Sequence, residues 1–233
     1  MGSKRYKQAA KLVDRAATYP LNQAVELLKQ MPKTKFDESV ELSVSLEIDP
    51  KKTEQAVRGT VTLPHGTGKV RRVIVFCKGE QELVAKQAGA DVAGAAELID
   101  KVLQGWMEFD VAIASPDMMK DVSRLGKILG PRGLMPNPKA GTVSADVAKA
   151  VQEVKGGRVE FKMDKLANLH VGVGKVSFAV ERLIENAKVV LEAIIRTRPS
   201  SVKGQFIRRV TVSSTMSPGI AVDINPFLEQ HNE

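Results

Sequence analysis

Lys33, Lys35 and Phe36 are the residues best suited to binding chemistry, and they stand immediately before a long alternating segment. An aromatic ring beside two ammonium groups suits RNA, because the ring can pack on a base or ribose while the lysines lie near phosphates. Phe36 could also be an ordinary core residue, which is the commoner role of phenylalanine. The trio alone leaves RNA binding and core packing both open.

A second candidate is the hydroxyl-rich stretch Ser213–Gly219, which has four hydroxyl side chains in five positions at the end of another predicted strand. Such side chains can hydrogen-bond to 2′-hydroxyls and phosphates. A plain polar turn has the same composition. Lys162, Lys165 and Lys175 could line the same surface or belong to a solvated face.

The motifs that would indicate catalysis or metal binding are missing. The three Gly-Lys pairs lack both the earlier glycine and the following hydroxyl of a phosphate-binding loop. Three histidines and one cysteine give no metal-ligand spacing. No Gly-x-Ser-x-Gly elbow nominates a nucleophile. We expect no catalytic activity, no metal and no cofactor.

The composition is that of a globular protein, with 43% apolar and 27% charged residues among 233. No apolar run is long enough to cross a membrane, and the first residues lack the apolar core of a secretory signal. Cys77 is the single cysteine, so no intrachain disulfide can form. The net charge of +8 favours a polyanionic partner. We expect a cytoplasmic protein that binds no membrane.

The chain contains two kinds of predicted strand, which differ in how apolar and polar residues are arranged. The segment 38–48 alternates apolar and polar residues, as do 158–163, 169–173 and 206–213, which predicts strands with one wet face. In contrast, Val73–Cys77 and Val111–Ala114 are apolar throughout and separated by helical patterns, which is typical of a parallel sheet covered by helices. A long amphipathic helix after Ser177, its expected N-cap, ends before Pro199.

The two kinds of strand predict an α/β protein of two domains. Residues 1–66 and 158–233 would form a discontinuous α+β domain from both termini, and residues 67–157 an inserted Rossmann-like α/β domain. The inserted segment has 13 basic and 11 acidic residues, whereas the outer segments have 22 and 16. Because the discontinuous domain carries most of the excess positive charge, it is the better candidate for binding a polyanion.

The most unusual stretch is Gly126–Thr142, which holds four glycines and three prolines. Glycine permits unusual φ values and proline fixes φ, so we expect a shaped loop through which no helix or strand runs. It could be a functional loop, or a long connection in which the glycines and prolines only fix the path of the backbone.

The same loop carries a family resemblance. Leu129–Thr142 resembles the L-one family of large-subunit ribosomal proteins of bacterial type at every position, and further matches occur in order along almost the whole chain. These further matches include Lys35–Val40, Ile48-Asp49-Pro50, Val57–Thr60, Leu63–Lys69, Phe109-Asp110, Ser115-Pro116-Asp117, Asp164-Lys165, His170 and Gly174-Lys175.

The resemblance implies a non-enzymatic, two-domain structural constituent of the large ribosomal subunit. Such a protein would bind large-subunit ribosomal RNA at the mobile stalk and assist release of deacylated transfer RNA from the exit site. It would also repress translation of its own messenger by binding the messenger's leader, and be a monomer outside the ribosome. Carried over position by position, the RNA contacts would be Lys35, Phe36, Ser39, Lys162, Asp164, Lys165, His170, Lys175, Ser214, Thr215, Met216 and Ser217.

Arg132 and Lys139 would give a secondary contact to RNA. Ser217 departs from the family pattern, which usually has glycine after the Thr-Met pair, so the contact geometry there is open. The alternative class is an enzyme that uses the α/β domain as a nucleotide site with Gly126–Thr142 as its lid.

Overall fold

The computed structural model describes residues 3–50, 52, 55–202 and 204–229. It confirms the mixed α/β class, with three sheets among these residues. The contacts divide the chain into two compact units: unit 1 is Met1–Gly68 with Val159–Glu233, and unit 2 is Lys69–Arg158. The domain boundaries predicted above stay a prediction, because a compact unit is not by itself an independently folding domain. Among the described residues, no helix is both long and apolar enough to cross a membrane.

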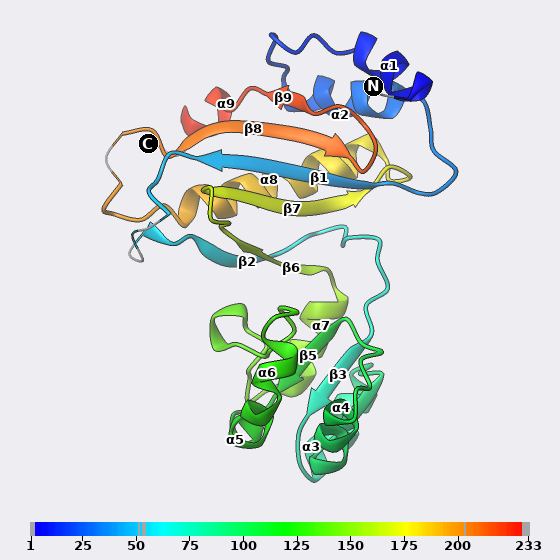
Figure 1. The fold of residues 1–233 in the computed structure, drawn as a ribbon, viewed down its shortest axis with the longest axis vertical. Helices are drawn as coiled ribbons and strands as arrows, with labels where there is room; N and C mark the ends of the chain where they lie inside the picture. The colour runs from blue at the N-terminus through cyan, green and yellow to red at the C-terminus, as the bar shows by residue number, and fades with distance from the viewer. Residues whose placement is uncertain (1–2, 51, 53–54, 203, 230–233) are drawn as a thin grey trace. The chain divides into compact units, whose positions relative to one another are not determined.

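Unit 1 is built around a four-stranded antiparallel sheet in the order β7-β1-β8-β9 (Figure 1). Its central pair is β1 (Ser39–Leu46) and β8 (Ile207–Ser214), and its outer strands are β7 (Asn168–Lys175) and β9 (Ile220–Val222). Strand β1 therefore pairs on both sides with segments that follow unit 2 in the sequence.

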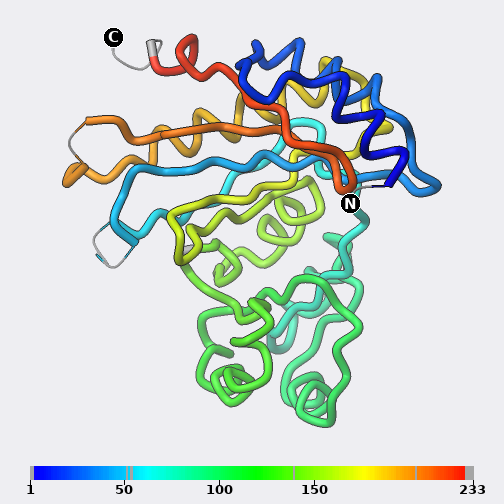
Figure 2. The backbone as a smooth tube through the Cα atoms, turned by 45° about the horizontal axis from the view of Figure 1, so that its top comes forward, coloured from blue at the N-terminus to red at the C-terminus, as the bar shows by residue number. Residues whose placement is uncertain are grey.

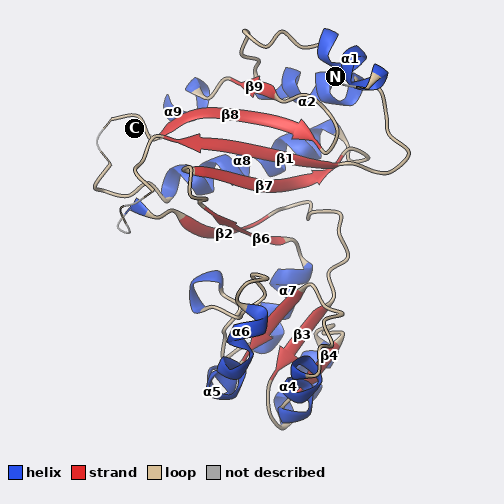
Figure 3. Ribbon diagram, in the orientation of Figure 1, coloured by secondary structure: helices blue, strands red, loops and turns tan. Residues whose placement is uncertain are grey.

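The apolar residues of β1 lie on the buried face of the sheet, as their alternation with polar residues predicts. Val40, Leu42, Val44 and Leu46 are all at most 4% exposed. They pack in a core with residues of α8 (Val180–Arg196) and α2 (Leu21–Gln30), helices that lie on one face of the sheet (Figure 3). The intervening polar residues of β1 lie on the other face, because successive side chains of a strand alternate between faces.

Smaller elements complete unit 1. They are α1 (Lys4–Lys11), α9 (Asn225–Glu229) and a two-stranded sheet of β2 (Arg58–Thr62) and β6 (Arg158–Lys162). The expected helix N-cap at Ser177 is wrong: α8 begins at Val180 after Ala179, which makes no side-chain cap. Ser177 instead donates through Oγ to Asp37 Oδ2 at 2.7 Å.

A buried amide fixes the segment that leads out of β2. Asn186 of α8 is fully buried, and its Nδ2 donates to the carbonyls of Gly66 at 3.0 Å and Val173 at 2.8 Å. Its Oδ1 accepts from the backbone amide of His65 at 3.2 Å. One side chain thus joins this segment to α8 and β7, and satisfies polar groups that would be costly to bury alone.

Unit 2 has a parallel sheet in the order β4-β3-β5, formed by Val92–Gly94, Val73–Phe76 and Val111–Ala114. The helices α3 (Glu80–Gln87), α4 (Ala96–Leu103) and α7 (Val147–Lys155) alternate with the strands or follow them. Strand β4 was not predicted, because only three residues form it and they show no periodicity. All four residues of β3 are buried, as expected of a strand covered on both faces.

As expected, no helix or strand runs through the whole of the described stretch Gly126–Thr142, although two short helical pieces lie within it. The helical region before it breaks into the short pieces η2 (Pro116–Met118), α5 (Met119–Val122), η3 (Ser123–Leu125) and α6 (Gly126–Leu129), and η4 (Pro138–Ala140) lies inside it. The stretch is shaped all the same: Gly133 and Gly141 have φ of 71° and 65°. Thr142 Oγ1 accepts from the backbone amide of Asn137 at 2.8 Å and closes the loop on itself.

Candidate RNA interface

The wet face of the unit 1 sheet is the face opposite α2 and α8, and it carries small polar side chains. Ser43 of β1 lies between His170 of β7 and Thr211 of β8 in the strand register. His170 Nδ1 and Ser43 Oγ are 3.1 Å apart. The three strands run side by side in Figure 2. Hydroxyls and an imidazole at adjacent strand positions form a surface that can hydrogen-bond to ribose and phosphate.

One end of this sheet brings together residues from three strand ends, and we call it the Phe36 end. Ser39 opens β1, Lys175 closes β7 and Ser214 closes β8. Ser39 is paired with Lys175, and the amide of Thr215 donates to the carbonyl of Ser39 at 3.1 Å. Sequence-predicted contact residues separated by more than a hundred positions therefore lie side by side.

Lys175 is held at the Phe36 end by unit 1 itself. Its Nζ donates to Ser39 Oγ at 3.0 Å and to the carbonyl of Asp37 at 3.2 Å. The ammonium group is therefore positioned before any ligand arrives, with its remaining donor capacity available to an anion. The Asp37 carboxylate accepts from Ser177, so that segments 37–39 and 175–177 are joined at several points.

Two large apolar side chains are exposed at the Phe36 end. Phe36 is 54% exposed and Met216 is 50% exposed, whereas most large apolar residues of unit 1 are buried. The interpretation of Phe36 as a core residue is therefore wrong. Lys35 beside it is also exposed. An exposed ring next to a cation is an arrangement that can pack on a base or ribose.

Beneath these side chains, Glu38 is only 6% exposed and holds the turn that follows β8. Its Oε2 accepts from Ser214 Oγ at 2.6 Å and from the backbone amide of Met216 at 2.9 Å. Burial alone would raise the pKa of the Glu38 carboxyl. The hydrogen bonds from Ser214, Met216 and Thr34, with the charge of Arg5, outweigh burial and leave this pKa below its ordinary value.

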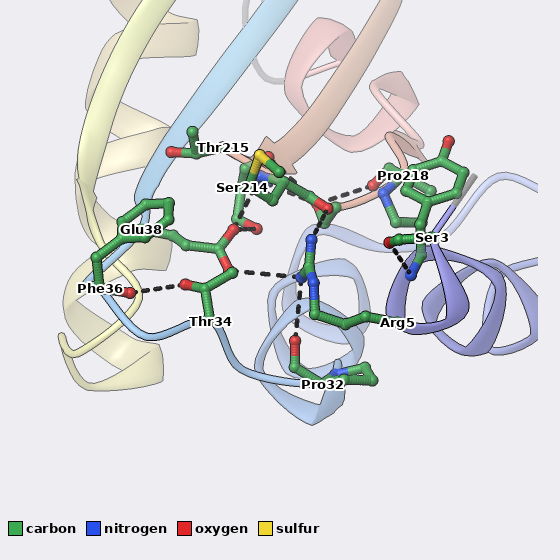
Figure 4. A network of polar contacts seen from close by, with 12 residues as sticks. Ser3, Arg5, Pro32, Thr34, Phe36, Glu38, Ser214, Thr215 and Pro218 are labelled. Atoms are coloured by element: carbon green, nitrogen blue, oxygen red, sulfur yellow. Dashed lines mark hydrogen bonds and ion pairs between the residues drawn. The ribbon is translucent and has the colours of Figure 1, made fainter. Parts of the chain in front are cut away.

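Arg5 connects α1 to the same turn (Figure 4). Its Nη2 donates to the carbonyl of Met216 at 2.8 Å, and its Nη1 donates to the carbonyl of Pro32 at 3.2 Å. Nη1 also lies 3.8 Å from Glu38 Oε1. A single guanidinium thus contacts the segment before β1 and the turn after β8. The backbone of the exposed Met216 is held at both polar groups, because its carbonyl accepts from Arg5 and its amide donates to Glu38.

Ser217 has a structural task of its own. Its Oγ accepts from the amide of Ser214 at 2.8 Å and donates to the carbonyl of Pro218 at 3.0 Å. Among the described residues other than glycine, only Ala167 has a positive φ, so the backbone at Ser217 does not require glycine. The hydroxyl closes the turn locally.

The predicted residues of the β6–β7 turn lie away from the Phe36 end, because they precede β7 while Lys175 ends it. Asp164 accepts at Oδ1 from the amides of Leu166 and Asn168, both at 2.8 Å. The hydrogen bond from the Asn168 amide is the main cause of a lowered Asp164 pKa. Asp164 therefore shapes the turn, while Lys162 and Lys165 are exposed.

Arg132, predicted as a secondary contact, is exposed in the loop of unit 2. The side chain of Lys139 lies outside the described residues. Unit 2 thus contributes one described candidate, and it belongs to a different compact unit from the Phe36 end.

Sequence reasoning missed Arg5 and Glu38. Glu38 stands within the matched segment Lys35–Val40, which was a usable signal, but an acidic residue is an unexpected neighbour for a polyanion. Arg5 gave no signal, because only the tertiary structure brings α1 to the turn after β8.

Comparison with known families gives a match over most of the chain. The model of the Ribosomal protein L1p/L10e family matches residues 28–218. The match includes the sheet strands β1, β7 and β8 and all of unit 2. It begins after α1, so Arg5 lies outside the matched residues.

Proposed function

This chain belongs to the Ribosomal protein L1p/L10e family, and we propose that it holds large-subunit ribosomal RNA on the wet face of the unit 1 sheet, chiefly at the Phe36 end. Proteins of this family are structural constituents of the ribosome that bind ribosomal RNA. The proposal assigns that binding to particular residues.

The observation that carries the proposal is the joint exposure of Phe36 and Met216 beside a positioned cation, Lys175. Neighbouring exposed apolar side chains are typical of a surface that a partner covers. RNA supplies both surfaces that this site can use, since bases and riboses can pack on the ring and the thioether while phosphates approach the ammonium group. Thr215 and the turn of Ser214 and Ser217 supply hydroxyls close by.

Within this proposal the site has two parts. The first part is the Phe36 end, which consists of Lys35, Phe36, Ser39, Lys175, Ser214, Thr215, Met216 and Ser217. The second part extends the contact along β7 and the β6–β7 turn through His170, Lys162 and Lys165. Asp164 supports that turn. Arg132 and Lys139 of unit 2 would make a secondary contact with RNA or transfer RNA.

The finer role follows from the family resemblance. We propose that residues 1–66 with 158–233 and residues 67–157 are two domains, and that the second is a Rossmann-like insertion acting as a mobile lever on the ribosomal stalk. The protein would assist release of deacylated transfer RNA from the exit site and repress translation of its own messenger. It would act in the cytoplasm as part of the large subunit, be a monomer outside the ribosome, and carry no catalytic activity.

Chemical footprinting of large-subunit ribosomal RNA tests the binding proposal. We expect the full chain to protect one helical junction, and the Thr215→Ala variant to lose that protection at matched concentration. If the chain protects no discrete site, the proposed function is wrong. Calorimetry with common nucleotides tests the absence of an enzyme site, since micromolar binding without RNA would favour a nucleotide-using enzyme instead.

The proposed repression has a separate test. A cell-free system that translates this protein's own messenger, with its leader intact, should make less product as purified protein is added. A messenger with an unrelated leader is the control. Equal synthesis from both messengers would remove the repressor role and leave ribosomal RNA binding unaffected.

A further inference from the structure

We propose that Arg208 and Arg209, at the start of β8, form a second phosphate-binding site for the same RNA at the opposite end of the wet face. This inference rests on the proposed function. We call this the arginine end. It lies where β8 begins, β1 ends and β7 begins, on the left of the sheet in Figure 1.

A β-bulge exposes both arginines. Ser45 of β1 is paired with Arg209, but the next residue, Leu46, is paired with Ile207, so Arg208 is an extra residue in β8. Regular alternation outward from the buried Val210 would direct Arg209 to the wet face and Arg208 into the core. The bulge restores the core position to Ile207, which is 1% exposed, and leaves both arginines exposed.

Within the described part of the chain, nothing occupies either guanidinium group. Among residues 3–50, 52, 55–202 and 204–229, no hydrogen bond or ion pair is made by the side chain of Arg208 or Arg209. Some other arginines of unit 1 are occupied: Arg58 pairs with Glu160, and Arg198 donates to the carbonyl of Gly204 at 2.8 Å. Two adjacent guanidiniums in a central strand, with no partner among the residues that the structure describes, present ten N–H donors that suit phosphate oxygens.

Further cationic and polar groups lie close to Arg208. It lines a hollow of about 720 Å³ together with Lys165 and Ser45. Lys165 is a predicted RNA contact of the β6–β7 turn, so the hollow links that turn to β8. The carboxylates of Glu47 and Asp49 also line the hollow. A phosphate in the hollow would be attracted to Arg208 and Lys165 and repelled by Glu47.

The distance between the two ends fits a single extended ligand. Ser39 and Ser45 are six residues apart on β1, which corresponds to about 20 Å at ~3.4 Å per residue. Between them lie Ser43, His170 and Thr211, which are polar side chains suited to ribose hydroxyls. The Phe36 end would supply the contacts that identify the RNA, and the arginine end would supply charge that fixes its direction across the sheet.

Salt-dependent filter binding of the full chain to large-subunit ribosomal RNA tests this site. Affinity falls as salt rises, so the slope of log affinity against log salt is negative. The double variant Arg208→Gln, Arg209→Gln should make this slope less steep by about 2, one for each lost phosphate contact. At 0.1 M salt its affinity should fall about tenfold, as expected for two exposed charge pairs. Glu47→Gln should tighten binding modestly, because it removes the repelling charge from the same hollow.

Arg182→Gln is the matched control. Arg182 is an exposed arginine of α8, on the covered side of the sheet, and should leave both slope and affinity unchanged when substituted singly. Footprinting of the double variant should lose protection at one part of the RNA site and keep the rest, whereas Thr215→Ala loses protection over the whole site.

The results separate the two proposals. If Thr215→Ala weakens binding but the double arginine variant behaves as the parent protein, the arginine end is wrong and the proposed function stands. The arginine end is also wrong if Arg182→Gln makes the slope less steep by as much per charge as the double variant. If the parent protein fails to bind a discrete site at all, both proposals are overturned. Matching thermal unfolding midpoints for all variants should establish that these exposed substitutions leave the fold intact.

Discussion

The backbone amide of Met216 donates to Oε2 of Glu38 over 2.9 Å, which joins a half-exposed side chain to a carboxylate that is 6% exposed. The carboxylate also accepts from Ser214 Oγ and lies near Arg5. The conformation of the exposed turn therefore depends on a buried charge.

Replacing Glu38 by glutamine should loosen the turn after β8. Glutamine keeps the shape but cannot accept as many charge-assisted hydrogen bonds, so we expect unfolding free energy to fall by about 1–3 kcal/mol. RNA affinity should fall about tenfold, which corresponds to ~1.4 kcal/mol. Urea unfolding and filter binding measure the two effects. Glu26→Gln, an exposed change on α2, is the control and should alter neither.

Acid should remove the contribution of Glu38. A carboxyl whose folded pKa is lowered stabilises the folded state above its unfolded pKa, and this stabilisation is lost as pH falls through the lowered folded value. The ordinary value is 4.5, so the stability difference between the parent protein and Glu38→Gln should be constant near neutral pH and shrink below about 4.5. Urea unfolding of both proteins from pH 7 to pH 3 tests this. A difference that stays constant to pH 3 would contradict it.

Single changes at the Phe36 end should affect RNA binding far more than changes in unit 2. Thr215→Ala removes a hydroxyl that accepts from the Ser39 amide at 3.1 Å, and Met216→Ala removes exposed apolar surface. Each should weaken binding to isolated stalk RNA at least about tenfold. Arg132→Ala should leave that affinity nearly unchanged. The reverse pattern in filter binding would show that RNA is bound primarily by unit 2.

The loop of unit 2 should tolerate alanine at one glycine and not at another. Gly141 has φ of 65°, and a Cβ there would lie 2.2 Å from Nη2 of Arg158, whose guanidinium pairs with Glu153. Gly141→Ala should therefore cost about 1–2 kcal/mol of stability from backbone strain alone. Gly126 has φ of −53° and open space around it, so Gly126→Ala should be neutral or stabilising. Equal effects in chemical unfolding would refute this account.

Strand periodicity was the most informative local signal in the sequence. The alternation of β1 was predicted because one face is buried, and apolar runs marked β3 and β5 because both faces are covered. The short β4 and the broken helices before Gly126 were not predictable in this way. Three- and four-residue elements have too few positions to establish a period.

Site residues could be predicted where the type of side chain itself suggests RNA binding. Lys35, Phe36 and Thr215 could be nominated from residue type and family resemblance. Glu38 and Arg5 could not, because their importance comes from partners far away in the sequence. Ser177 shows the same limit: its local pattern favoured a helix cap, and a tertiary contact with Asp37 took its hydroxyl instead.

The placement of β1 also has a consequence for the order in which the protein can fold. A chain is made from its amino terminus, and both neighbours of β1 follow unit 2. All contacts within unit 2 can form once Arg158 has been synthesised, whereas β1 must wait for β7 and then β8. Throughout that interval a nascent chain carries a strand with one apolar face and two unpaired edges. Slow synthesis after Arg158 would therefore increase aggregation of the amino-terminal segment.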